Sequence, residues 1–421
     1  MRVRMLAPGL LCIIAARLFA QDTADLLIRI KAMEARIQAL ESEVQNLKSE
    51  PGVAPPAPIL QAPAPVVLGG AGPAAAKALN PDISVIGDFI GAAGYGANRK
   101  IPSLEMHESE VGFQEVIDPY ARADFFISFG ERGVNLEEGF LTFTALPAGL
   151  QLKVGKMRAA FGKVNTLHNH VLPWADRPLV NQNLIGGEDG INDAGLSLSR
   201  ILPAPKGIFL EGLAQVYRGD SDNVFRADKR TDVSAIGHLR LYHDFSESTN
   251  LDAGVSYARG HSPFGDGTNQ LYGGDFTLRW KPLRRAIYRS FVARSELVWA
   301  RTTVTLPSLP FPRAATSKPF GYYVSGDYQL GRRWFFGGRF DRSQRGACLP
   351  TNPDTTPCDL PVPSTKLLQD TGGSLVLTYW PSEFSQIRGQ LRRTRYGEGL
   401  TANELIFQFI FSMGAHGAHA F

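Results

Sequence analysis

Two histidines one residue apart, His168 and His170, stand in the longest polar segment of the sequence, 163–188. An H-x-H pair can offer two imidazole ligands to a metal ion, but no third ligand is placed beside them. We therefore predict structural or lining roles for both histidines, with no metal site and no cofactor. The same segment also carries Trp174, Asp176 and Arg177.

Signatures of catalysis are missing: the sequence has no nucleophile elbow, phosphate-binding loop, paired-cysteine zinc motif or H-E-x-x-H. Ser197 or Ser234 could be combined with His238 as nucleophile and base, but almost any strand-rich chain offers such a set. His416 and His419 read as solvated residues. A net charge of only +4 gives no support for a nucleic-acid partner. We predict that the protein is not an enzyme.

Charged residues recur at every second position of short segments, which is the spacing of one face of a β-strand. In YARADFFISF (120–129) and FSQIRGQLRRT (384–394), charged and polar residues share one face and apolar residues the other. Charged side chains on a low-dielectric wall can replace part of an ion's hydration and concentrate it. The charged residues that we assign to this lining are Arg122, Asp124, Lys153, Arg240, Asp275, Arg279, Arg294, Glu296, Asp327, Arg339, Asp341, Arg388 and Arg392.

The last strand, ELIFQFIFS (404–412), carries Leu405, Phe407, Phe409 and Phe411 on one face. In water such a strand would invite aggregation, so we predict that its aromatic face contacts lipid. Trp280, Trp334 and Trp380 beside short turns, and Trp299 near a long loop, are typical of an aromatic girdle. The alternative is a soluble sandwich whose core is the apolar face.

The connections between strands alternate in length. Short turns fall at 118, 146, 203, 246, 330 and 381, and long polar loops at 97–107, 163–188, 218–232, 260–269, 302–319, 343–367 and 397–403. The tight GERG at 130 is the exception. This alternation predicts an all-β fold, a 16-stranded antiparallel transmembrane β-barrel over 82–421, closed by pairing the last strand with ISVIGDFIG. An even strand count puts both barrel ends in the periplasm.

The N-terminus has a basic start, an apolar stretch and Ala20 before Gln21, so we predict a signal peptide over 1–20. Cys12 lacks the preceding small residue that lipidation needs. The other two cysteines, Cys348 and Cys358, stand in one polar loop, and we favour a disulfide over two thiols.

Residues 21–50 carry a heptad pattern, with Ile30, Ile37 and Val44 at a positions and leucine or methionine at d positions. Opposite charges at g and e′ favour a parallel coiled coil of identical chains, while a single amphipathic helix on a partner surface is the alternative. The a and d residues favour a dimer, but a trimer is possible if the barrel dictates it. Residues 51–81 form a Pro/Ala/Gly-rich linker.

The chain resembles the outer-membrane porins of Gram-negative bacteria, and most of all the phosphate-selective porin family. The resemblance rests on LPAGLQLKVGKMRAAFGKVN (146–165), DRPLVNQNLIGGEDGINDAGLSLS (176–199), the strand count and the terminal Phe421, and it covers about 82–421. It implies a homotrimer, an arginine-lined pore and a third external loop, 163–188, that narrows the barrel as a constriction loop. Acidic residues share those walls, which argues against strict phosphate selectivity.

We therefore expect a passive diffusion channel for small hydrophilic solutes, with a weak preference for anions. Its expected location is the outer membrane, in contact with lipid, with the coil in the periplasm and peptidoglycan as a further partner that the coil could contact. The rival hypothesis is an envelope tether or adhesion protein whose coil binds cell wall or partners and whose barrel only anchors it.

Overall fold

The computed structural model describes residues 81–95, 101–131, 133–221, 224–264, 267–306, 313–346 and 366–414, with helical residues at 31, 35, 36, 38, 39 and 42. Outside the described residues lie the signal peptide, most of the coil, nearly all of the linker, Cys348, Cys358 and Phe421. No helix within the described ranges is long and apolar enough to span a membrane. The strands all belong to one compact unit, 76–421.

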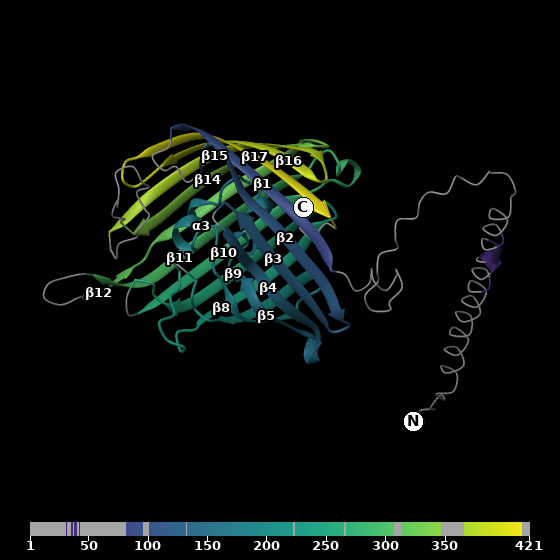
Figure 1. The fold of residues 1–421 in the computed structure, drawn as a ribbon, viewed down its shortest axis with the longest axis horizontal. Helices are drawn as coiled ribbons and strands as arrows, with labels where there is room; N and C mark the ends of the chain where they lie inside the picture. Colours follow the sequence, from purple (N-terminus) through teal and green to yellow (C-terminus); the bar gives the residue numbers. More distant parts are fainter. Residues whose placement is uncertain are drawn as a thin grey trace, which may run out of the picture. The chain divides into compact units, whose positions relative to one another are not determined.

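Strands make up nearly all of the regular secondary structure described in this unit (Figure 1). The first eight are β1 (Asp82–Tyr95), β2 (Glu105–Asp118), β3 (Ala121–Gly130), β4 (Gly133–Leu146), β5 (Leu150–Arg158), β6 (Asn192–Leu202), β7 (Ile208–Tyr217) and β8 (Ser234–Ser246). The others are β9 (Thr249–His261), β10 (Thr268–Trp280), β11 (Phe291–Leu306), β12 (Arg313–Ser317), β13 (Phe320–Gly331), β14 (Trp334–Gly346), β15 (Leu367–Ser382), β16 (Ser385–Arg395) and β17 (Thr401–Gly414).

The sheet closes on itself as an antiparallel barrel. Strand β1 pairs with β2 on one side and with β17 on the other, in a register that runs from Ser84 opposite Gly414 to Tyr95 opposite Asn403. The short β12 pairs only with the far end of β11, while β11 also pairs directly with β13. Sixteen strands therefore form the closed ring, which confirms the expected count, and β12 is an addition that the sequence did not reveal.

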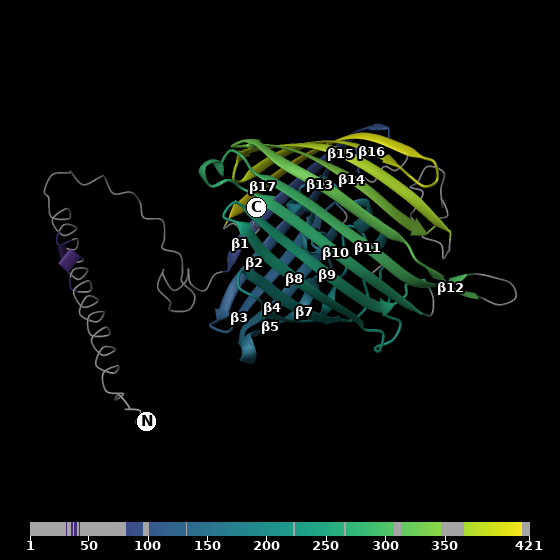
Figure 2. The same ribbon diagram turned by 180° about the vertical axis from the view of Figure 1, so that it is seen from behind.

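Most connections at one end of the barrel are short, and the longest connection lies at the other end. The pairs β2–β3, β4–β5, β8–β9, β13–β14 and β15–β16 are joined by two or three residues, while residues 159–191 join β5 to β6. In both views, β12 lies at one end of the barrel, and the start of β1 and the end of β17 lie at the other (Figures 1 and 2). The tight connection after Gly130 begins β4 at Gly133, whose φ of 130° suits glycine.

Exposed side chains on the outer surface are mainly apolar. On β17, Leu405 and Phe407 are 52% and 44% exposed, whereas the flanking Glu404 and Gln408 are 7% and 2% exposed. Trp299 stacks on Phe320 across the outer face, with ring centroids 4.7 Å apart. A polar inside and an apolar outside is the pattern of a barrel in lipid rather than of a soluble sandwich.

The main apolar core lies inside the barrel. Phe161, Trp174 and Ile185 from the 159–191 connection are at most 1% exposed and cluster with inward side chains of the wall such as Tyr323 and Val298. The interior is therefore not uniformly polar, because this connection brings apolar residues into it.

Candidate functional site

The 159–191 connection, hereafter the inner loop, crosses the interior of the barrel. Its helix α3 (Leu179–Leu184) contacts β11, β13, β14 and β15, and lies within the ring of strands in Figure 1. At the other side, His168 contacts side chains of β2 and β4. Because these two groups of strands stand on opposite sides of a sixteen-strand ring, the loop spans the cross-section, as a constriction loop would.

Two carboxylates of the barrel wall, one on β11 and one on β14, accept hydrogen bonds from backbone N–H groups of the inner loop. The carboxylate of Glu296 accepts hydrogen bonds from the backbone N–H groups of Lys163 and Val164, at 2.7 and 2.6 Å. Asp341 accepts one from the N–H of Leu179, at the start of α3, at 3.1 Å. Two residues that we predicted to line the wall therefore position the loop.

Asp176 joins the inner loop to two other strands. Its carboxylate accepts hydrogen bonds from Arg339 on β14 at 3.0 Å and from Arg392 on β16 at 2.9 Å, and Gln390 donates a further one. Burial alone would raise the pKa of Asp176, but the two guanidinium groups outweigh it and lower the pKa to about 2. Arg392 also donates to Glu404 on β17 at 2.6 Å.

Trp174 and Arg177 lie within the packed part of the inner loop. Trp174 is fully buried, meets Tyr323 edge to face at 5.2 Å, and lies under the guanidinium of Arg339 at 4.8 Å. Arg177 donates to the carbonyl oxygens of Val164 and Leu167, at 3.0 and 2.6 Å, and so supports the loop's own backbone.

The two histidines face carboxylates of the wall. The Nδ1 atom of His168 lies 2.6 Å from Glu110 and 3.0 Å from Glu137, and its Nε2 lies 2.8 Å from Glu138. Burial opposes the charged ring, but the hydrogen bonds to these three carboxylates outweigh it and raise the pKa of His168 above its ordinary value. His168 therefore acts as a buried cation between β2 and β4.

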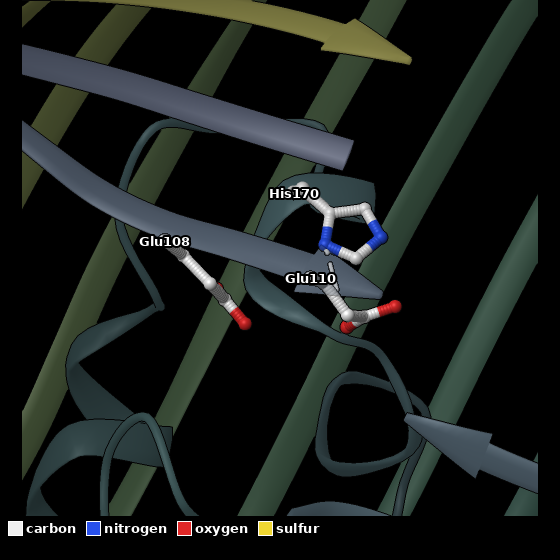
Figure 3. Close-up of side chains that lie close together, drawn as sticks. All are labelled: Glu108, Glu110 and His170. Carbon is white, nitrogen blue, oxygen red and sulfur yellow. Dashed lines mark ion pairs between the residues drawn. The ribbon is translucent and has the colours of Figure 1, made fainter. Parts of the chain in front are cut away.

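His170 lies beside a second group of carboxylates on the same strand. Its Nδ1 is 3.9 Å from Glu110, and Glu108 faces the same space (Figure 3). We expected no third ligand beside the histidines, and the sequence gives no sign of one, because these glutamates lie about 60 residues earlier in the chain. They are visible only as alternate acidic residues in EMHESEV (105–111).

A separate cluster gathers around Asp252 on β9. Arg240 donates to its carboxylate at 2.9 and 3.0 Å, Lys163 of the inner loop also contacts it, and Arg279 approaches to 3.8 Å. Arg240 and Arg279 belong to the predicted lining, whereas Asp252 was missed. Its signal was its position in phase with the buried residues Ser256 and Ala258 of TNLDAGVSYARGH (249–261).

The remaining predicted lining residues, apart from Asp275, have local partners. Arg122 pairs with Asp124 on β3 at 2.7 Å, and Arg294 pairs with Asp327. Lys153 lies 4.6 Å from the centre of the Phe140 ring. Arg388 donates to Gln408 at 2.6 Å. Asp275 is 8% exposed on β10.

The nominated serines and histidine do not come together. His238 forms a hydrogen bond with Ser256 at 2.8 Å, and Ser197 accepts one from Gln215 at 2.9 Å. Within the described residues, Ser234 is buried and its hydroxyl has no hydrogen-bond partner. Neither Ser197 nor Ser234 therefore forms a nucleophile–base pair with His238.

No family model matches the sequence. A curated relative, an uncharacterized protein of Aquifex aeolicus (strain VF5), is 29% identical over 407 residues, which cover 83% of this chain and 81% of the relative. Among solved structures, the anion-selective porin from Comamonas acidovorans aligns with a TM-score of 0.52 and 10% identity, over 79% of this chain and 98% of that one. The outer membrane channel DcaP of Acinetobacter baumannii aligns with a TM-score of 0.50 and 12% identity, over 79% and 96%.

These similarities define the class of fold: this chain has the sixteen-stranded barrel of outer-membrane porins. At such low identity they speak for the fold alone. They do not single out the phosphate-selective family that the sequence resembles.

Proposed function

We propose that the chain is an outer-membrane porin, a passive diffusion channel for small hydrophilic solutes with a weak preference for anions. The observation that carries the proposal is the unequal exposure of charges on the inner face. The side chain of Arg122 is 42% exposed and that of its partner Asp124 only 8%. Arg240 and Arg279 are each 41% exposed, whereas Asp252 between them is 1% exposed. Solutes would therefore meet guanidinium groups with carboxylates behind them.

Such a surface favours anions for an electrostatic reason. Fixed positive charges on a low-dielectric wall raise the local concentration of anions, and several weak sites in series allow each ion to leave again. The buried carboxylates limit the excess of positive charge, so the preference is weak. The inner loop would set the narrowest part of the path, with no coupling to an energy source.

The finer features rest on the sequence. The resemblance to phosphate-selective porins, and a structural neighbour described as an anion-selective porin, support phosphate-like anions as solutes. We also propose a mature chain starting near residue 21, a periplasmic coil over 21–50, and a trimer whose stoichiometry the barrels fix.

Changing Ile37 and Leu40 to Asp should then weaken association of the 21–50 segment without closing the pore. The mass of a 21–50 peptide measures the association, and conductance of the full-length protein measures the pore.

Bilayer recordings test the channel and its selectivity. Purified protein should give open channels, and a salt gradient should give a reversal potential of the sign expected for anion preference in both chloride and phosphate. Replacing Arg240 and Arg279 with Gln removes two exposed cations and leaves Asp252 less compensated. We expect this variant to shift the reversal potential toward cations.

The matched control is Arg200→Gln, since Arg200 alternates with the inward residues of β6 and belongs to its exposed outer face. It removes the same charge but should leave the reversal potential unchanged. An equal shift in both variants would contradict the assignment of the inner face. A folded protein that shows no conductance would favour the tether hypothesis instead.

A further inference from the structure

The side of the barrel formed by β2 and β4 holds an unusual concentration of buried acid. Glu108 and Glu110 on β2 are 6% and 1% exposed, and Glu137 on β4 is 7% exposed. The neighbouring Glu138 contacts His168 from the same side. Carboxylates are rarely buried this deeply unless cations or donors compensate them.

The compensation visible around these four carboxylates is incomplete. Arg158 contacts Glu137 at 3.3 Å, and His168 contacts Glu110, Glu137 and Glu138. These contacts do not reach Glu108. Arg177 is close by, but its donors are engaged with backbone and amide oxygens of the inner loop.

Glu108 is the carboxylate that this network leaves out. Both of its oxygens are buried and neither accepts a hydrogen bond from a donor among the described residues, and the neighbouring carboxyl group is that of Glu137. An uncompensated buried carboxylate costs several kcal/mol, so Glu108 must either carry a proton or bind a cation that the protein atoms do not supply. Its carboxyl group lies beside that of Glu110 and the ring of His170, with one ligand atom of each within 4.8 Å of the others (Figure 3).

We propose that Glu108, Glu110 and His170 bind a divalent transition-metal cation of the zinc type. One ligand atom from each residue lies within 4.8 Å of the others, and Nδ1 of His170 is 3.9 Å from Glu110. Ligands of a tetrahedral zinc ion are about 3.3 Å apart, given bonds of about 2.0 to 2.1 Å. A bound ion would draw these ligand atoms together through rotation of the two glutamate side chains and the imidazole.

The ligand types decide the class of cation. Calcium and magnesium prefer sets made entirely of oxygen, whereas an imidazole nitrogen beside two carboxylates suits zinc and its first-row neighbours. A divalent ion would also bring positive charge to this group of buried carboxylates. It would tie the inner loop to β2, on the side of the barrel opposite α3.

Cobalt is a suitable probe, because Co²⁺ replaces Zn²⁺ in such sites and absorbs visible light. Full-length protein in detergent, first freed of metal with a chelator, is dialysed against CoCl₂. We expect about one cobalt per chain, with visible bands that disappear when ZnCl₂ is added. X-ray absorption at the cobalt edge should show one imidazole nitrogen in the first shell.

Glu108→Gln should weaken cobalt binding at least tenfold, and His170→Gln should remove the imidazole signal. The control is Glu115→Gln, the same change on β2 at a position of the opposite face, which should bind cobalt like the wild type. Heat-dependent gel migration checks that each variant is folded.

Three results would overturn the proposal: no cobalt bound by the wild type, binding of calcium but not cobalt, or undiminished binding by a folded Glu108→Gln. In the first case, a proton on Glu108 rather than a metal would satisfy the buried carboxylate. If the variants do not fold, the wild-type cobalt spectrum decides alone, since a first shell without imidazole excludes His170.

Discussion

At the scale of single residues, the carboxylate of Asp176 holds together parts of the chain that are far apart in sequence. Two of its donors, Arg339 and Arg392, are positively charged and almost fully buried, and they come from different strands. Removing one partner of a buried ion pair leaves the others without compensation, which costs about 3 to 5 kcal/mol. Asp176 therefore contributes both to the docking of the inner loop and to the local charge.

Asp176→Asn should make the channel more anion-selective and less stable. The amide keeps the shape of the side chain but leaves Arg339 and Arg392 without a counter-charge from the loop. Reversal potentials in a KCl gradient measure the first effect, and the denaturation midpoint in detergent measures the second. Asp228→Asn, a change at an exposed carboxylate paired with Arg226, is the control and should alter neither quantity by much. A variant with unchanged selectivity would show that permeating ions do not sense this cluster.

The contribution of Asp176 to stability should also depend on pH in a defined direction. Its pKa falls from 3.8 to about 2 on folding, so the ionised carboxylate stabilises the folded state fully above the unfolded value. That stabilisation is lost as the pH falls through about 2. The difference in denaturation midpoint between wild type and Asp176→Asn should stay constant from pH 7 to 5 and shrink between about 4 and 2. A difference that grows on acidification would contradict the assigned pKa.

Alternation in the sequence was enough to divide each strand into two faces, as the exposures on β17 and β16 illustrate. Alternation could not predict which oppositely charged residue each charged side chain contacts. Arg240 meets Asp252, and Arg392 meets Glu404, because of the register between neighbouring strands. The pairing with Asp176 further depends on the path of a loop that touches residues more than 160 positions away. Such long-range contacts leave no local pattern.

At the scale of elements, the inner loop can cross the interior of the barrel because side chains of the wall accept hydrogen bonds from its backbone. The sequence predicted a constriction loop over 163–188, and the connection spans 159–191. The six-residue helix α3 and the five-residue β12 were not predicted, because elements so short have weak patterns of their own. Their stability comes from the strands that they contact.

Glu296→Ala should loosen the start of the inner loop. The change removes the acceptor of two buried N–H groups, at Lys163 and Val164, and each unsatisfied group costs about 1 to 3 kcal/mol. Hydrogen exchange by mass spectrometry should show faster exchange at residues 163–164 with little change on the strands. Glu211→Ala is the control, since Glu211 is a wall glutamate on β7 near Arg240. Equal exchange in both variants would mean that Glu296 does not hold the loop.

At the scale of the whole molecule, the barrel depends on joining its first and last strands, which leaves no open edge. The sequence predicted this closure because two apolar, alternating segments stand at the two ends of the barrel region. It could not give the register, since a shift by two residues keeps every side chain on its face. In the structure, Val85 lies opposite Met413.

Cysteines placed at Val85 and Met413 should therefore form a disulfide across the seam. Directly opposed residues of antiparallel strands have Cα atoms about 4.5 to 5.5 Å apart, within the range of a disulfide. The bridge should keep the unfolded chain compact, so that it migrates faster on a denaturing gel without reductant. Cysteines at Val85 and Leu405 form the control, because Leu405 lies opposite Ala93. Efficient cross-linking of the control but not of the first pair would rule out this register.

The inner loop is fastened to β2 and β4 on one side and to β11, β14 and β16 on the other. It thus forms a chord across a cylinder, and a chord of fixed length resists flattening of the circle around it. Stretching or thickening the surrounding bilayer changes the lateral pressure on the wall and tends to flatten the circular cross-section of the barrel. The inner loop opposes this flattening. In the proposed channel, the aperture beside the inner loop should consequently respond little to membrane tension, and removing one of these contacts should increase the response.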